Sequence, residues 1–300
     1  MAGRRLIPIL PTALTLGNLA CGFIALARLV DALQFATEDG GALDPAFGRY
    51  IVEAAWFIVG AMVFDALDGR VARGMGQTSA FGTQLDSLAD VVSFGMAPAL
   101  LAKVVYEHTM RELGLRYHPG IVTLLCSLFL MGAALRLARF TVAADNEEDN
   151  HETFVGLPSP AAAATLISAC LFIFRGRTEI WLEPASADAL GTWMLRSLPG
   201  MAAMLGLLMI SNVRYVHLAQ RYVRPRTLPS TVVRLLLLTW LVVMFHEWLL
   251  FGASLLYVVG GLLLWLRARA RGQSPVDALP PPWDPDDEEE HRPAARGGSP

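Results

Sequence analysis

Residues 65–90 read DALDGRVARGMGQTSAFGTQLDSLAD, a stretch that places four aspartates between two long apolar runs. The runs cover roughly residues 50–68 and 84–106. Each comes close to the ~20 apolar residues that a helix needs to cross the hydrocarbon core of a bilayer. Because only a short segment joins them, we expect two neighbouring antiparallel membrane helices whose aspartates meet at one end.

Similar apolar runs recur along most of the chain. Of its 300 residues, 54% are hydrophobic and 17% are charged, whereas a soluble domain carries roughly a quarter charged residues. No alternating strand pattern competes, and a chain that spans a bilayer must be helical or a closed barrel. We therefore predict an all-α polytopic membrane bundle of about eight transmembrane helices, at roughly 10–31, 50–68, 84–106, 119–141, 158–174, 197–212, 231–248 and 250–267.

The composition changes near Gly272. Residues 273–300 are rich in proline and acidic side chains and show no hydrophobic period. Such a segment cannot bury enough apolar surface to fold, so we predict a disordered cytosolic tail. Residues 1–272 then form one membrane-embedded domain that contains the catalytic residues.

The basic residues predict how the bundle sits in the membrane. With both termini in the cytosol, the inner segments hold about twice as many arginines and lysines as the outer loops, as the positive-inside rule expects. The loop 213–230 and the Arg267–Arg271 cluster contribute most of this bias. The N-terminal run could instead begin a signal peptide or, at Leu19-Ala20-Cys21, resemble a lipoprotein cleavage site. Its length and internal polar residues favour a retained first span.

The four aspartates are out of place in so apolar a chain. Asp65 and Asp68 are spaced i,i+3, and Asp86 and Asp90 i,i+4, so each pair shares one helical face. Carboxylates near a membrane span usually face a site rather than lipid. Two divalent cations would balance their charge, and oxygen ligands suit Mg²⁺ or Mn²⁺. Such a metal pair acts in displacement at phosphorus, which predicts phosphoryl or phosphatidyl transfer.

Two alternatives explain part of this pattern. The aspartates could pair with Arg70 and Arg73 or cap helices, but that accounts for only one or two of them. A divalent-cation transporter would place its carboxylates near the bilayer midplane, often in paired broken helices. Here they lie at helix ends beside a glycine-rich connection, which favours an enzyme.

The spacing of these residues resembles the complete signature of the CDP-alcohol phosphotransferase family. The signature runs Asp65-x-x-Asp68-Gly69-x-x-Ala72-Arg73, eight further residues, then Gly82-x-x-x-Asp86-x-x-x-Asp90. The resemblance implies a six-helix core with its site open to the cytosolic side of the cell membrane. It also implies that all four aspartates bind metal and that Asp90 acts as general base. The residues that it implies for CDP-diacylglycerol are Gly69, Ala72, Arg73 and Ser79. We add Asn18, although a helix–helix hydrogen bond would explain that residue equally well.

Further stretches resemble one branch of this family, the bacterial phosphatidylserine synthases. They are LPTALTLGNLACGF at 10–23, DSLADVVSFGMAPA at 86–99, LRLARF at 135–140, FVGLPSPAAA at 154–163 and, more weakly, SNVRY at 211–215. The likeness implies transfer of the phosphatidyl group from CDP-diacylglycerol to L-serine, with release of CMP.

Binding of serine is expected to need a cation for its carboxylate. Arg136 and Arg139 are candidates, unless they only extend to the membrane interface, and Ser93 is a candidate for the pocket wall. A phosphorylated acceptor, such as glycerol phosphate or inositol phosphate, is the alternative and would need more basic residues. The resemblance also implies a homodimer, and we expect no nucleic-acid partner.

Overall fold

The computed structural model of the chain describes residues 9–35, 45–74, 80–145, 156–176, 184–211, 213, 251–263, 265–267 and 269–270. Every regular element in these ranges is helical, which confirms the predicted all-α fold. In chain order the elements are α1 (Ile9–Leu33), α2 (Pro45–Gly74), α3 (Ala80–Asp90), the π-helix η1 (Val91–Met96), α4 (Ala97–Glu112), α5 (Pro119–Asp145), α6 (Ser159–Gly176) and α7 (Pro184–Ile210).

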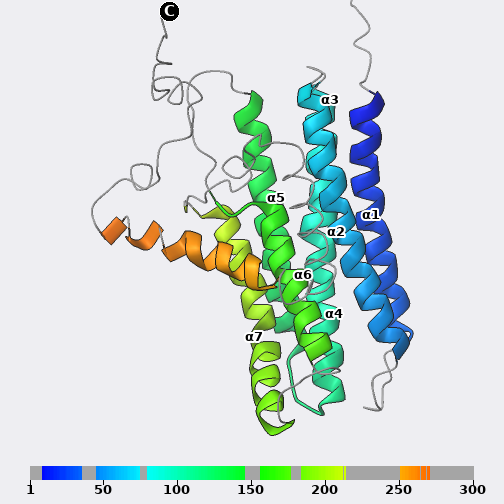
Figure 1. The fold of residues 1–300 in the computed structure, drawn as a ribbon, viewed down its shortest axis with the longest axis vertical. Coiled ribbons are helices and arrows are strands. Elements are labelled where there is room, and N and C mark those ends of the chain that lie inside the picture. Colours follow the sequence, from blue (N-terminus) through cyan, green and yellow to red (C-terminus); the bar gives the residue numbers. More distant parts are fainter. Residues whose placement is uncertain are drawn as a thin grey trace, which may run out of the picture.

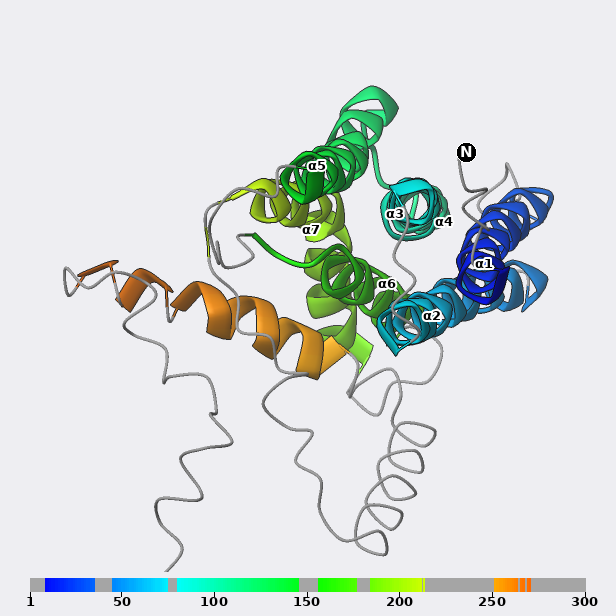
Figure 2. The same cartoon turned by 90° about the horizontal axis from the view of Figure 1, so that it is seen from above.

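The long helices lie side by side and form one bundle (Figure 1). Seen from above, α6 lies between α2, α4 and α7, and it contacts all three (Figure 2). The helices long and apolar enough to cross a membrane are Leu10–Leu33, Ala46–Gly69, Phe81–Glu112, Pro119–Arg139 and Thr192–Ile210. This confirms a polytopic helical membrane protein. The predicted span 231–248 lies outside the described residues, so the total of eight stays a prediction.

The last predicted span, 250–267, corresponds to helical residues at 251–263, 265–267 and 269–270 that do not follow the bundle. This segment, drawn in orange, lies across the bundle axis in both Figure 1 and Figure 2. Its first turns pack on α6, where the rings of Phe251 and Phe172 stack with centroids 5.0 Å apart. The segment therefore covers one side of the bundle instead of extending parallel to it.

Several helices continue beyond the predicted spans. α2 runs to Gly74 rather than to residue 68, and α7 begins at Pro184 rather than near residue 197. The apolar pattern marks only the part of a helix that suits hydrocarbon. Hydrogen bonding within the helix continues into the headgroup region, where polar residues are tolerated.

α3, η1 and α4 form one continuous helical rod with a π-helical stretch in its middle. There the Ala97 N–H donates to the carbonyl of Val92, five residues earlier. Such stretches are rare and frequently lie at functional sites. Because η1 begins directly after Asp90, it sets the direction of Ser93 relative to that carboxylate.

α5 and α7 are in backbone contact. A Cβ atom on Gly132 would collide with the carbonyl of Gly206, and one on Gly206 would collide with the carbonyl of Leu128. Small residues allow membrane helices to approach this closely. The contact holds the part of α5 that carries Arg136, one turn further along.

Candidate functional site

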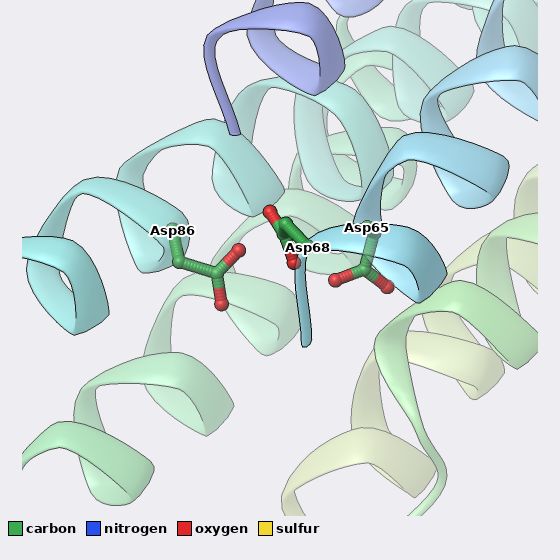
Figure 3. A group of neighbouring side chains, drawn as sticks. All are labelled: Asp65, Asp68 and Asp86. Carbon is green, nitrogen blue, oxygen red and sulfur yellow. The ribbon is translucent and has the colours of Figure 1, made fainter. Parts of the chain in front are cut away.

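Three of the four predicted aspartates meet in space. Asp65 and Asp68, near the C-terminal end of α2, lie beside Asp86 of α3 (Figure 3). One carboxylate oxygen from each lies within 4.8 Å of the other two. Asp68 is buried, and the other two are half-buried. Carboxylate oxygens gathered in this way are the ligands that Mg²⁺ and Mn²⁺ prefer.

The surroundings of Asp86 fit a bound cation. Its Oδ1 atom is buried and has no hydrogen-bond partner among the described residues. A buried carboxylate oxygen without a partner is costly, because it has lost water and gained nothing in return. A divalent ion held by Asp65, Asp68 and Asp86 would satisfy this atom and reduce the repulsion between the three charges.

Asp90 stands apart from this group of three. It lies one turn after Asp86 at the end of α3 and is 7% exposed. Its Oδ1 accepts a 3.0 Å hydrogen bond from the side-chain amide of Asn18 on α1. Its charge also interacts with those of Asp65 and Asp86. Asp90 is thus close enough to act with the other aspartates while having a hydrogen-bond partner of its own. Whether it also binds metal stays a prediction.

α1 supplies one buried polar side chain to each aspartate pair: Asn18 to Asp90, as described above, and Thr15 to Asp68. The Thr15 hydroxyl donates to Asp68 Oδ2 over 3.0 Å, and the Ser93 hydroxyl donates to the backbone carbonyl of Asn18, also over 3.0 Å. Asn18 and Ser93 were predicted site residues, whereas Thr15 was not. The i,i+3 spacing of Thr15 and Asn18 in an apolar helix could have shown that both share one face.

The two arginines predicted for the acceptor have different environments. Arg136 is 9% exposed, donates to the Ser159 hydroxyl over 2.8 Å, and interacts electrostatically with Asp90. Arg139 is exposed and donates to the carbonyl of Ile210, at the C-terminal end of α7, over 3.2 Å. Arg136 therefore belongs to the surroundings of the aspartates, whereas Arg139 links α5 to the end of α7. Ser159 was missed because only the fold brings it to Arg136.

The residues predicted to contact the CDP-lipid follow the metal-site aspartates along the chain. Gly69, Ala72 and Arg73 lie in the last turns of α2, so the segment directly after Asp68 is helical rather than a loop. Ser79 lies outside the described residues. The contacts of these four residues with substrate stay predictions.

The arrangement suits chemistry on a phosphate ester near a membrane surface. Three clustered carboxylates can hold divalent metal, which acts as a Lewis acid on phosphate oxygens. A fourth carboxylate nearby can accept a proton from an attacking hydroxyl. A buried guanidinium completes the set with a positive charge for an anionic substrate group.

The chain matches a family model described as CDP-alcohol phosphatidyltransferase over residues 8–195. Relatives with the name CDP-diacylglycerol–serine O-phosphatidyltransferase include one from Helicobacter pylori, 35% identical over 169 residues, which are 55% of this chain and 60% of the relative. One from Methanocaldococcus jannaschii is 35% identical over 155 residues, 52% of this chain and 59% of the relative. One from Bacillus subtilis is 31% identical over 159 residues, 53% of this chain and 73% of the relative.

The chain spans about 60% of the length of the first two of these relatives. No solved structure matches it. The family match, however, covers more than half of the chain and includes all four aspartates. The predicted family is thus confirmed: the chain belongs to the CDP-alcohol phosphatidyltransferase family.

Proposed function

We propose that this chain transfers the phosphatidyl group of CDP-diacylglycerol to L-serine, giving phosphatidylserine and CMP. The observation that carries the proposal is the cluster of Asp65, Asp68 and Asp86, with Asp90 one turn further along α3. The family is generally dependent on divalent metal, and this cluster offers such a metal its ligands. Serine as acceptor is supported by the names of the relatives.

The proposed cofactor is a pair of divalent ions, Mg²⁺ or Mn²⁺. Asp65, Asp68 and Asp86 would hold them, with Asp90 completing the ligand set. When bound, such ions neutralise diphosphate oxygens and disperse the charge that develops on the leaving phosphate.

Asp90 is proposed as the general base. Asn18 bonds one oxygen of its carboxylate, and the other can receive the hydroxyl proton of serine. The serine oxygen forms a bond to the phosphorus that carries diacylglycerol, while the bond from this phosphorus to the bridging oxygen breaks. The bridging oxygen keeps the electron pair and leaves as part of CMP.

The substrates are proposed to lie on either side of the aspartates. Gly69, Ala72, Arg73, Ser79 and Asn18 are the candidates for contacts with the CDP-lipid. For serine the candidates are Ser93, Arg136 and Arg139, and Arg136 has the strongest support. Its burial and its interaction with Asp90 would put a fixed positive charge beside the base, which suits the serine carboxylate.

We propose a homodimer in the cytoplasmic membrane, with the aspartates facing the cytosol and residues 273–300 forming a cytosolic tail. The apolar helices support insertion in a membrane, and the distribution of arginines supports this orientation. Aspartates near helix ends suit a lipid substrate, because the headgroup can react at the interface while the acyl chains stay in the bilayer.

The test is CMP release by purified protein in detergent micelles containing CDP-diacylglycerol and Mn²⁺ or Mg²⁺. L-serine, glycerol 3-phosphate and inositol phosphate are compared as acceptors, and the lipid product is identified by mass spectrometry. Serine-dependent release is expected, with loss in Asp90→Asn and in EDTA. Asp31→Asn is the matched control, since the Asp31 carboxylate is partly exposed and bonds Arg28 of its own helix over 3.2 Å. Release with another acceptor alone would overturn the assignment of serine.

A further inference from the structure

α1 turns one polar face toward the two helices that carry the aspartates. Thr15, Asn18 and Gly22 are spaced by three and four residues, so they share one side of α1. Thr15 and Asn18 each donate a hydrogen bond to an aspartate, and the two aspartates belong to different helices. α1 thus contributes two buried hydrogen-bond donors to the site.

The hydroxyl of Thr15 has two acceptors within reach. Asp68 Oδ2 lies at 3.0 Å and the backbone carbonyl of Pro11 at 3.1 Å. A hydroxyl has one proton, and an ionised carboxylate is a stronger acceptor than a neutral carbonyl. The proton is therefore directed to Asp68. Thr15 is 4% exposed and Asp68 6%, so water competes little for this bond.

Packing alone does not explain why the buried residue at position 18 is an asparagine. It is fully buried, its Nδ2 donates to Asp90, and its Oδ1 has no partner among the described residues. Burying an amide oxygen without a partner costs about 1–3 kcal/mol. An apolar side chain of similar size would avoid that cost, so the N–H donor is the feature that Asn18 contributes.

The backbone of α1 is itself held against η1 at this point. The Ser93 hydroxyl donates to the Asn18 carbonyl. Gly22, one turn later, permits the approach, because a Cβ atom there would collide with Ser93 Oγ. The donor on Asn18 therefore has a fixed position relative to Asp90, which directly precedes η1.

We infer, on the basis of the proposed function, that Thr15 and Asn18 are positioning residues with separate tasks. Thr15 holds the Asp68 carboxylate in the orientation that binds metal. Asn18 holds the Asp90 carboxylate in the orientation that receives the serine proton. On this inference Asn18 acts through its bond to Asp90, in place of the contact with the CDP-lipid named above. Partners of this kind typically change metal affinity or activity by about 10–100-fold when they are removed.

The test separates metal binding from turnover. Mn²⁺ binding without substrates is measured by electron paramagnetic resonance, and kcat and KM are measured for both substrates. Thr15→Val, which removes the hydroxyl at nearly constant shape, is expected to weaken Mn²⁺ binding about 10-fold, and Thr15→Ser to restore it. Asn18→Leu is expected to lower kcat about 10–100-fold with Mn²⁺ affinity and both KM values unchanged. Asn18→Asp, which keeps the shape but faces Asp90 with a second carboxylate, is expected to lose at least as much.

Thr109→Val is the matched control. Thr109 is also buried in a helix, and its hydroxyl bonds the carbonyl of Val105 over 2.7 Å. It lies about 28 Å along the rod from Asp90, so wild-type Mn²⁺ binding and kcat are expected. Thr15→Ala and Asn18→Ala take the place of any isosteric variant that does not fold.

Two results would overturn the inference. Wild-type Mn²⁺ affinity in Thr15→Val would remove Thr15 from metal positioning. A raised KM for CDP-diacylglycerol with unchanged kcat in Asn18→Leu would make Asn18 a substrate contact. Mn²⁺ binding needs no turnover, so it tests Thr15 even if the wild-type protein releases no CMP with any acceptor, which would be the failure of the proposed function.

Discussion

At the scale of single residues, the charge of Asp86 opposes the fold unless a cation is present. Its Oδ1 is buried without a partner among the described residues, and it lies against Asp65 and Asp68. Asp86→Asn removes one of three repelling charges. In EDTA we expect the variant to unfold at a higher temperature than the wild-type protein, because the repulsion is relieved.

With Mn²⁺ the order of stability should reverse. A metal that binds only the folded state raises the unfolding temperature, and the rise grows with the logarithm of its affinity; Asp86→Asn loses a ligand. Thermal unfolding in detergent, with and without Mn²⁺, measures both effects. Asp31→Asn should show neither, since exposed ion pairs contribute roughly 0–1 kcal/mol. A variant that gains as much from Mn²⁺ as the wild-type protein would exclude Asp86 as a ligand.

The two arginines of α5 should differ in kinetics. Arg136 is buried, bonds Ser159 and interacts with Asp90. Arg136→Lys keeps the charge but loses the planar fork, and we expect the KM for serine to rise about 10-fold, the loss of roughly one charge-assisted hydrogen bond. Arg139→Lys should leave that KM unchanged, because Arg139 bonds the end of α7. Initial rates at saturating CDP-diacylglycerol and varied serine give both KM values, and equal increases in the two variants would return Arg139 to the acceptor site.

How far the sequence predicts the site depends on the distance between partners along the chain. Asp65, Asp68 and Asp86 were predictable because the helical period puts each pair on one face and a short connection joins their helices. The bonds from Thr15 to Asp68 and from Arg136 to Ser159 join different helices. Helical spacing alone does not say which faces of distant helices meet, so these partners emerge only from the fold.

At the scale of helices, the contact between α5 and α7 depends on two glycines. Gly132→Ala would place a methyl group against the backbone of Gly206, which cannot move aside as a side chain could. Inside a helix, alanine is normally more stabilising than glycine by about 1 kcal/mol. For Gly132→Ala we expect the opposite: overpacking should lower the free energy of unfolding by about 1–3 kcal/mol.

Gly200→Ala on α7 is the matched control, because a Cβ atom there would meet no atom of the described residues within 4 Å. It should be neutral or slightly stabilising. Unfolding temperatures from fluorescence-detected size-exclusion chromatography compare the two variants. If Gly132→Ala were as stable as Gly200→Ala, α5 and α7 would not be in backbone contact.

The helices themselves were predictable from apolar runs, but their ends and the π-helix were not. α2 continues through Gly69 and Arg73 to Gly74, although glycine and arginine after an apolar run suggest a loop. In η1 the sequence VVSFGM contains Gly95 but no proline, and one glycine in a helical run does not predict a π-helix. At Gly95 the π-helix packs closely on α5, where a Cβ atom would meet Leu130 and Ala133.

At the scale of the whole molecule, the length of the rod formed by α3, η1 and α4 indicates where the aspartates lie relative to the membrane. From Asp90 to Glu112 the helical backbone is continuous, and its rise is about 33 Å. That length matches the hydrocarbon thickness of roughly 30 Å. We therefore expect the aspartates and the turn at residues 113–118 to lie near opposite faces of the bilayer.

If the aspartates face the cytosol, that turn faces outward. Single cysteines at two exposed positions, Arg116→Cys in the turn and Gln84→Cys beside Asp86, test this in a background from which Cys21, Cys126 and Cys170 have been removed. A membrane-impermeant maleimide should label Arg116→Cys in intact spheroplasts, and Gln84→Cys only after permeabilisation. The reverse pattern would put the aspartates on the outer face, away from cytosolic serine. Labelling of both positions before permeabilisation would mean that the rod does not separate the two sides. Only the expected pattern is consistent with all three arguments: the length of the rod, the distribution of arginines, and the proposed reaction, whose acceptor serine is dissolved in the cytosol.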